Sequence, residues 1–347
     1  MKVILYCELP YSYEILYPLY KVGLKRDYKQ LWYIPEAVKS QLKLDPDLEM
    51  TSSMKDLDDF QSDAILVPTN SIPHYLKGVK VQIFHGLAGE KKGHFRIRHY
   101  FDLYLTQGPY FTRQFKALAK KHNDFHVVET GWSKPDLYYQ EQLSFQQKKT
   151  EILTNNSVKT IVLYAPTFSP SLASAKDLLP ELISLANSES IYLFIKFHDK
   201  MAPGIIHEYK QSFDGIDNVE IMNQKDIIQV LNISDYLISD TSSVVYEFIL
   251  LNKPALSYRS RSKNINWLNI RYPQQLIPAF RSLAADDEYA LKRKKIIAEY
   301  HPYTDGKSSE RMWDAVEKYI SEWGVPEKRK LSFYRRQKVY SLHGKLN

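Results

Sequence analysis

Small hydroxyl residues follow directly on an apolar run and precede a second apolar run in the second half of the chain. The segment reads SDTSSVVYEF from Ser239 to Phe248. We expect a helix to begin within it, and the first N–H groups of a helix have no partner inside the helix and carry a partial positive charge. A phosphate at that point would gain these donors together with the hydroxyls of Ser242 and Ser243. The same residue types are also good N-caps, so capping explains the segment without any ligand.

Two histidines each come at the end of an apolar run. Gly86 follows His85, and a glycine there would allow a sharp turn that leaves the imidazole at the rim of a site. A neutral imidazole in that position can accept a proton near pH 7. The period-two alternation of a strand puts Lys196 and His198 on the same side of their run, where both could face an anion. Taken singly, each of these residues is more often structural than functional.

A third motif reads DGKSSER from Asp305 to Arg311, just before the last helix that we expect, over 308–322. Ser308 or Ser309 could cap that helix. Lys307 and Arg311 would lie near its start, where cations oppose the helix dipole unless an anion is present. The motif therefore indicates a bound phosphate.

Strands that alternate with helices must position these residues. The expected strands are 2–7, 31–34, 64–68, 81–84, 103–106, 126–129, 160–165, 191–197, 219–222, 236–239 and 254–258. The expected helices are 12–26, 109–121, 178–187, 226–232, 242–251, 289–300 and 308–322. This alternation predicts βαβ units with parallel sheets, which bind ligands at the carboxyl ends of their strands. Gly86, and Pro166 and Thr167 at another strand exit, would then form the wall of a cleft.

The polar segment 139–159 divides the chain, because its Gln, Lys, Thr, Asn and Ser residues are typical of a linker. We therefore predict an N-terminal domain over 1–145 and a C-terminal domain over 146–323, both doubly wound and facing each other across a cleft. The last helix would cross back toward the first domain. Residues 259–275 show weak periodicity and are expected to form a long loop.

The composition excludes several classes of protein. Of 347 residues, 44% are apolar and 25% are charged, which excludes a disordered chain. The single cysteine, Cys7, excludes a disulfide framework and a cysteine-based zinc site. No run approaches the ~20 apolar residues of a spanning helix, and the first apolar run is too short for a signal peptide. We expect a cytoplasmic protein.

The residues 324–347 form a basic tail. They hold seven basic residues and one acidic residue, so they carry +6 of the net charge of +7. Apolar and aromatic side chains are interleaved with the charges, as expected for a segment at the anionic, cytosolic face of a membrane. A solvated tail without a partner is the alternative.

The order of these motifs along the chain resembles the CDP-glycerol glycerophosphotransferase family. These are the teichoic-acid-type polyol-phosphate transferases, which have a GT-B architecture of two Rossmann-like domains. The resemblance covers roughly 81–320, and the most specific stretch is 231–258. Thr241 stands where the family usually has tyrosine, and Asp199 stands where it usually has proline.

The resemblance implies a role for each motif. His85 would be the general base on the acceptor hydroxyl, and His198 would contact the transferred phosphate. Phosphate would be bound by the residues that match two family segments, namely Ser242 and Ser243, and Gly306, Lys307, Ser308 and Arg311. Beyond the resemblance, we expect Lys196, Asp240, Thr241 and Glu247 to contribute to the binding of the donor and its phosphates.

The expected reaction moves glycerol phosphate, or a related polyol phosphate, from a CDP-linked donor to a hydroxyl of a lipid-linked or cell-surface glycan precursor, and it releases CMP. The CDP-polyol is a substrate, and we expect no cofactor, no metal and no nucleic-acid partner. The basic tail would bind the inner surface of the plasma membrane, which would make the protein peripheral.

Two alternatives remain open at this point. A GT-B glycosyltransferase would use the same helix start for a nucleotide sugar, with Glu247 as the carboxylate near the sugar or ribose. A protein without enzymatic activity could bind polyanions through 324–347, and its binding would then depend steeply on salt.

Overall fold

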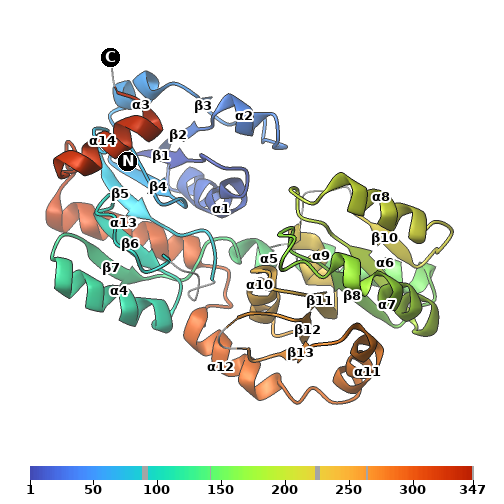
Figure 1. Ribbon diagram of the computed structural model, residues 1–347. Coiled ribbons are helices and arrows are strands. Elements are labelled where there is room, and N and C mark those ends of the chain that lie inside the picture. The colour runs from blue at the N-terminus through green and yellow to red at the C-terminus, as the bar shows by residue number, and fades with distance from the viewer. Residues whose placement is uncertain (88–92, 141, 223–226, 263–264, 346–347) are drawn as a thin grey trace. The chain divides into compact units, whose positions relative to one another are not determined.

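The computed structural model describes residues 1–345 except 88–92, 141, 223–226 and 263–264 (Figure 1). The chain divides into two compact units. Unit 1 consists of Met1–Gln140 and Glu299–Asn347, and unit 2 consists of Glu141–Ala298. Each unit has its own parallel sheet, so the prediction of two Rossmann-like domains is confirmed.

Seven strands form one parallel sheet in the described part of unit 1, in the order β3-β2-β1-β4-β5-β6-β7. The strands are β1 (Lys2–Tyr6), β2 (Lys29–Tyr33), β3 (Met50–Thr51), β4 (Ala64–Val67), β5 (Val79–Gln82), β6 (Leu103–Thr106) and β7 (His126–Glu129). The helices are α1 (Ser12–Lys25), α2 (Glu36–Lys39), α3 (Met54–Phe60), α4 (Pro109–His122), α5 (Asp136–Gln140), α13 (Ser308–Trp323) and α14 (Phe333–His343). The strand order reverses between β1 and β4, which is the point where doubly wound sheets bind ligands.

Six strands form the described sheet of unit 2, in the order β10-β9-β8-β11-β12-β13. They are β8 (Thr160–Tyr164), β9 (Ile191–Ile195), β10 (Val219–Ile221), β11 (Tyr236–Ser239), β12 (Ala255–Tyr258) and β13 (Leu268–Ile270). The helices are α6 (Gln142–Asn155), α7 (Ala175–Ser188), α8 (Pro203–Ser212), α9 (Ile227–Ile233), α10 (Val244–Leu250), α11 (Leu276–Ala285) and α12 (Ala290–Tyr300), with a 3-10 turn η1 (Pro273–Gln275). The reversal of strand order lies between β8 and β11.

One face of the unit 2 sheet carries a large apolar core. Alternate residues of the strands, such as Tyr164 and Ile195, pack there against apolar side chains of α7, α8 and α11. The buried side chains of α10 do not belong to this core, so α10 covers the opposite face. Because helices cover both faces of the sheet, the strands are buried on both sides and consist of nearly continuous apolar residues.

Two expectations about the middle of the chain are wrong. The predicted linker forms the helix α6, whose Phe145 and Ile152 are buried. The expected loop at 259–275 contains β13, which pairs with β12, and the turn η1. α6 is mostly polar and β13 is only three residues long, so neither gives a strong local pattern, and packing within unit 2 stabilises them.

The boundary at the end of unit 2 also differs from the expected one. The chain returns to unit 1 at Glu299, and α13 packs on α1 and β6, as expected for a last helix that crosses back toward the first domain. Trp313 is fully buried, and its Nε1–H donates to the carbonyl of Leu19 at 2.9 Å. The apolar face of α13 therefore belongs to the core of unit 1.

The basic tail is docked on unit 1 instead of being a free arm. Arg329 is 13% exposed at its side chain and donates to the carboxylates of Asp102 at 2.6 Å and Asp124 at 3.1 Å. Val339 of α14 is fully buried. The β4–β5 connection, 68–78, is described throughout and forms no helix, and α14 packs against its His74. His343 of α14 forms a hydrogen bond with Tyr6 of β1, although α14 is the last helix of the chain (Figure 1).

None of the helices in the described residues is long and apolar enough to cross a membrane.

Candidate functional site

The predicted phosphate-binding residues of unit 2 lie at the carboxyl ends of three neighbouring strands. Thr167 follows β8, His198 follows β9, and the segment 240–243 follows β11. These strands are adjacent in the order β9-β8-β11. The structure therefore gathers the three segments at one edge of the sheet, at the point where the strand order reverses.

The turn between β11 and α10 presents hydroxyl groups that are not used for capping. Ser243 occupies the N-cap position in helical conformation, and its side chain makes no capping hydrogen bond. The Ser242 hydroxyl accepts only a long bond, 3.4 Å, from the N–H of Val244. Thr241, Ser242 and Ser243 are all half-buried. Ordinary capping therefore does not explain this run of hydroxyl residues.

α10 is shorter than the expected helix over 242–251. It runs for seven residues, from Val244 to Leu250, and its dipole is correspondingly small. The hydroxyls and neighbouring cations must therefore supply most of the attraction for an anion. Glu247 lies half-buried on α10, one turn from its start.

Asp240 organises the loop that follows β8. Its carboxylate is fully buried and accepts hydrogen bonds from the N–H of Thr167 at 2.9 Å and from the N–H and hydroxyl of Ser174, both at 2.9 Å. Burial raises the pKa of Asp240, and these hydrogen bonds oppose that shift. Asp240 thus holds Pro166 and Thr167 in place, and its oxygens face protein donors rather than a phosphate.

His198 is arranged as a hydrogen-bond donor. Its Nδ1 accepts the N–H of Lys200 at 3.1 Å, so the neutral imidazole carries its proton on Nε2. Burial lowers the pKa of His198, and the Lys200 and Lys196 cations lower it further, while Asp199 opposes them. The ring also packs against Phe168, with centroids 4.4 Å apart. A neutral Nε2–H next to Lys196 can donate to a phosphate oxygen.

His85 in unit 1 has the opposite tautomer. Its Nδ1 lies 3.0 Å from the carbonyl oxygen of Pro68, which can only accept, so Nδ1 carries the proton and Nε2 carries the lone pair. The exposed ring packs on Tyr11, with centroids 5.4 Å apart. A carbonyl that holds Nδ1–H orients the ring and raises the basicity of Nε2, as expected for a general base.

The backbone before His85 turns at Phe84 rather than at Gly86. Phe84 has a φ of 59°, in the left-handed region, whereas Gly86 has no positive φ. Such a conformation is uncommon for a bulky residue and is held here by packing of the Phe84 ring on Phe115, with centroids 5.0 Å apart. The expectation that Gly86 makes the turn is wrong, because the surrounding aromatic core enforces the turn two residues earlier, at Phe84.

The motif at 305–311 is satisfied by the protein's own acids. The N–H groups of Ser308 and Ser309 donate to the buried carboxylate of Asp136 at 3.0 and 2.7 Å, so they do not point at a free anion site. Arg311 donates to both oxygens of Asp305, at 2.8 and 3.1 Å, and to the carbonyl of Thr130. The negative charge that the sequence pattern requires is therefore supplied by the carboxylates of Asp136 and Asp305, not by a bound phosphate.

Gly306 and Lys307 belong to the same turn. Gly306 has a φ of 68°, which favours glycine, and it lies against the Tyr139 side chain. The side chain of Lys307 is exposed, and its N–H donates to Asp305 at 3.1 Å. Of the motif's predicted phosphate ligands, Lys307 remains accessible, and Ser308 is buried.

Polar residues at the strand-order reversal of unit 1 were missed by the sequence reasoning. Glu8 follows β1 and accepts the hydroxyl of Thr69 at 3.1 Å, and it lies 3.7 Å from His343 of α14. His343 Nδ1 lies 3.0 Å from the hydroxyl of Tyr6. Only the rule that ligands bind at this reversal could have singled out Glu8.

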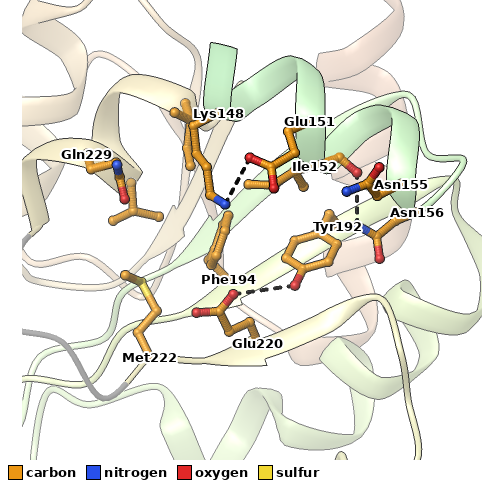
Figure 2. Close-up of a pocket in the computed structure, with 12 residues that line it drawn as sticks. Lys148, Glu151, Ile152, Asn155, Asn156, Tyr192, Phe194, Glu220, Met222 and Gln229 are labelled. Atoms are coloured by element: carbon orange, nitrogen blue, oxygen red, sulfur yellow. Dashed lines mark hydrogen bonds and ion pairs between the residues drawn. The ribbon is translucent and has the colours of Figure 1, made fainter. Parts of the chain in front are cut away.

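A pocket of about 360 Å³ in unit 2 is unrelated to these residues (Figure 2). It lies over the face of the sheet, between α6, α9 and the strands β9 and β10. Polar side chains that line it interact with one another, since Lys148 pairs with Glu151 and the Tyr192 hydroxyl donates to Glu220. None of the predicted site residues lines it.

The described residues contain no group of three or more histidine, cysteine, aspartate or glutamate side chains placed to hold a metal ion.

Sequence comparison relates the chain to enzymes of teichoic acid synthesis. The profile of the family CDP-Glycerol:Poly(glycerophosphate) glycerophosphotransferase matches residues 20–264. The teichoic acid glycerol-phosphate primase of Bacillus subtilis is 28% identical over 234 residues, which are 63% of this chain and 58% of the primase. The teichoic acid ribitol-phosphate polymerase TarL of Staphylococcus aureus is 27% identical over 67% of this chain and 46% of the polymerase. The chain spans about half the length of these curated relatives.

Solved structures of low sequence identity share the fold. The wall teichoic acid polymerase TagF matches with a TM-score of 0.69 at 18% identity, over 93% of this chain and 89% of that one. Staphylococcus aureus MnaA, in its structure with UDP, matches with a TM-score of 0.67 at 15% identity, over 92% and 97% of the two chains. Two Rossmann-like domains of GT-B type are therefore the fold of this protein.

Proposed function

Because the chain belongs to the CDP-glycerol:poly(glycerophosphate) glycerophosphotransferase family, we propose that it transfers glycerol phosphate, or a related polyol phosphate, from a CDP-linked donor to a hydroxyl group of an acceptor. CMP is the second product. The acceptor is a lipid-linked or cell-surface glycan precursor.

The observation that supports this proposal is the turn from Asp240 to Ser243. The Ser243 hydroxyl makes no capping hydrogen bond and the Ser242 hydroxyl accepts a long one, and the turn lies at the carboxyl edge of the sheet beside His198 and Lys196. Hydroxyl, imidazole N–H and ammonium donors from neighbouring strands suit the oxygens of a diphosphate.

In the proposed reaction the acceptor oxygen attacks the phosphorus that carries the polyol. The new O–P bond forms as the bond from that phosphorus to the bridging oxygen breaks, and the bridging oxygen leaves with CMP. Nε2 of His85 takes the proton of the acceptor hydroxyl. His198, Ser242 and Ser243 stabilise the negative charge on the phosphoryl oxygens, and each such preorganised donor contributes about a hundredfold or more in rate.

A donor screen tests this function. The purified chain is incubated with CDP-glycerol, CDP-ribitol, UDP-glucose and UDP-N-acetylglucosamine, and the released nucleotides are separated by HPLC. CMP release from a CDP-polyol is expected. Nucleotide release from the UDP-sugars alone would instead identify a glycosyltransferase and overturn the proposal.

His85→Gln tests the assignment of the base. The variant should lose at least a hundredfold in the rate of acceptor-dependent CMP release while it still binds CDP-glycerol. Full activity of His85→Gln would remove His85 from the mechanism.

We further propose that the docked tail attaches the enzyme to an anionic membrane surface. Arg329 and Arg335 are used inside the protein, but Phe333 and Tyr334 of α14 are 60% and 85% exposed, with Lys330, Arg336 and Lys338 exposed near them. Exposed aromatic residues among cations are typical of an interfacial helix. Co-sedimentation with phosphatidylglycerol vesicles, but not with phosphatidylcholine vesicles, is expected. Unchanged binding after replacement of these three cations by glutamine would contradict the proposal.

A further inference from the structure

A second pocket of unit 2, here called the α7–α8 pocket, opens next to the phosphate-binding residues. It has a volume of about 670 Å³ and is lined by the loop after β8, the starts of α7 and α8, and the residues that follow β12. A volume of this size is typical of pockets that hold a small molecule or a segment of a larger one.

The pocket is joined to the predicted site at two places. Phe168 lines the pocket, and its ring also packs on His198, with centroids 4.4 Å apart. Arg261 also lines the pocket, and its backbone N–H donates to the hydroxyl oxygen of Thr241 at 3.1 Å. A ligand that extends from the phosphate site past Phe168 therefore enters this pocket.

The pocket lies on the face of the sheet that α10 does not cover. Tyr258 belongs to the core that packs with α7, α8 and α11, and its hydroxyl donates to Asp177 of α7 at 2.8 Å. In-line phosphoryl transfer puts the attacking and leaving oxygens on opposite sides of the phosphorus. With the CMP phosphate held at the start of α10, the pocket is placed for the other partner of the reaction.

The rim of the pocket is cationic. Lys176, Arg259 and Arg261 are exposed, and neither Lys176 nor Arg261 forms an ion pair with any residue in the described part of the chain. Asp177 is held by Tyr258 and Arg259, which leaves Glu208 as the remaining acid of the lining. Guanidinium groups match the geometry of phosphate oxygens.

We propose that the α7–α8 pocket binds the phosphodiester groups of a polyol-phosphate acceptor. The proposal rests on the proposed function and makes it more specific, because the acceptor already carries phosphate. Lys176 and Arg261 contact the acceptor's phosphate oxygens, and the apolar floor near Ile205 receives the polyol carbons.

Fluorescence anisotropy with the full chain and a labelled synthetic oligo(glycerol phosphate) tests the pocket without turnover. The double variant K176Q/R261Q should weaken binding of the oligomer by about tenfold or more, because two charged contacts are lost. The control K210Q/R271Q removes the same two residue types at exposed positions outside the pocket and should bind like the wild type. I205W, which fills the pocket without changing its charge, should also weaken binding.

The affinity for CDP-glycerol, measured by calorimetry on the same variants, separates the acceptor from the donor. It should be unchanged in K176Q/R261Q. A selective loss of CDP-glycerol binding would assign the pocket to the donor, and equal oligomer binding by K176Q/R261Q and the control would remove it from substrate recognition; either result overturns the proposal. Failure of the proposed function has a different signature, since the wild type would then release no CMP from any CDP-polyol.

Discussion

Replacing Asp240 by asparagine should destabilise unit 2 at the loop that follows β8. The carboxylate of Asp240 is fully buried and accepts hydrogen bonds from three donors, namely the N–H of Thr167, which both oxygens share, and the N–H and hydroxyl of Ser174. Asparagine is nearly the same size, but it offers one oxygen in place of two. Its NH₂ group would face an N–H donor, which cannot accept from it.

The cost follows from these contacts. Hydrogen bonds to a charged group are worth about 1.5–3 kcal/mol each, and a buried donor left without a partner costs about 1–3 kcal/mol. Asp240→Asn should therefore lower the free energy of unfolding of unit 2 by about 2–4 kcal/mol. For a domain of this size, such a loss lowers the melting temperature by roughly 5–15 °C.

Differential scanning fluorimetry measures this shift, and hydrogen exchange shows where the protein opens. Asp214→Asn is the matched control, because Asp214 is exposed in the turn before β10 and should change stability by less than about 0.5 kcal/mol. In Asp240→Asn, exchange should rise in the loop 165–174. A melting temperature within one or two degrees of the control, with unchanged exchange in that loop, would refute the reasoning.

Three further predictions concern unit 1. Burial lowers the pKa of His343 to about 4, so between pH 6.5 and pH 4 the unfolded chain binds a proton that the native protein excludes, and stability falls as the pH falls. Protonation of His343 in the unfolded chain should by itself lower the free energy of unfolding by about 2 kcal/mol at pH 5. The melting temperature of H343Q should therefore fall less between pH 7 and pH 5 than that of the wild type, and an identical fall would contradict this. R329A breaks the partly buried pairs to the sheet edge and should cost about 3–5 kcal/mol, with faster trypsin cleavage of the tail than in the exposed control K338A. G131A places a Cβ 2.4 Å from the Ser308 hydroxyl at a φ of 89°, so its free energy of unfolding, measured by thermal denaturation, should be about 2–4 kcal/mol lower than that of the wild type. A melting curve identical to that of the wild type would contradict this and show that the start of α13 can move away.

Most of the fold could be predicted from the sequence because its strands are buried on both faces. Runs such as 64–67 and 161–164 are continuous and apolar, and they are strands in the structure. α6 and α14 were not predicted, because α6 has few apolar residues and because basic residues interrupt the apolar and aromatic residues of α14. The packing that stabilises them comes from residues distant in the sequence, which no local pattern reveals.

The site was only partly predictable for a similar reason. Strand exits could be located from the sequence, and the rule for parallel sheets gathers those of unit 2 at one edge. The sequence does not show which carboxylate accepts hydrogen bonds from the free N–H groups at the start of a given helix. Asp136, 172 positions earlier in the chain, accepts hydrogen bonds from the first N–H groups of α13. The cations near the start of α13 led to the prediction of a bound phosphate, but a carboxylate of the protein takes that place. Glu8 lies at the strand-order reversal of unit 1, and nothing in its local sequence distinguishes it.

Calorimetric titration of CDP-glycerol into the wild type and into S242A/S243A tests most directly whether the turn after β11 binds the donor's diphosphate. Both serines are half-buried and lack strong internal hydrogen bonds, so the double variant should remain folded. The account predicts that its affinity for CDP-glycerol falls by about tenfold or more, while cytidine alone binds as weakly to the variant as to the wild type. Equal affinity of the two proteins for CDP-glycerol would contradict the account.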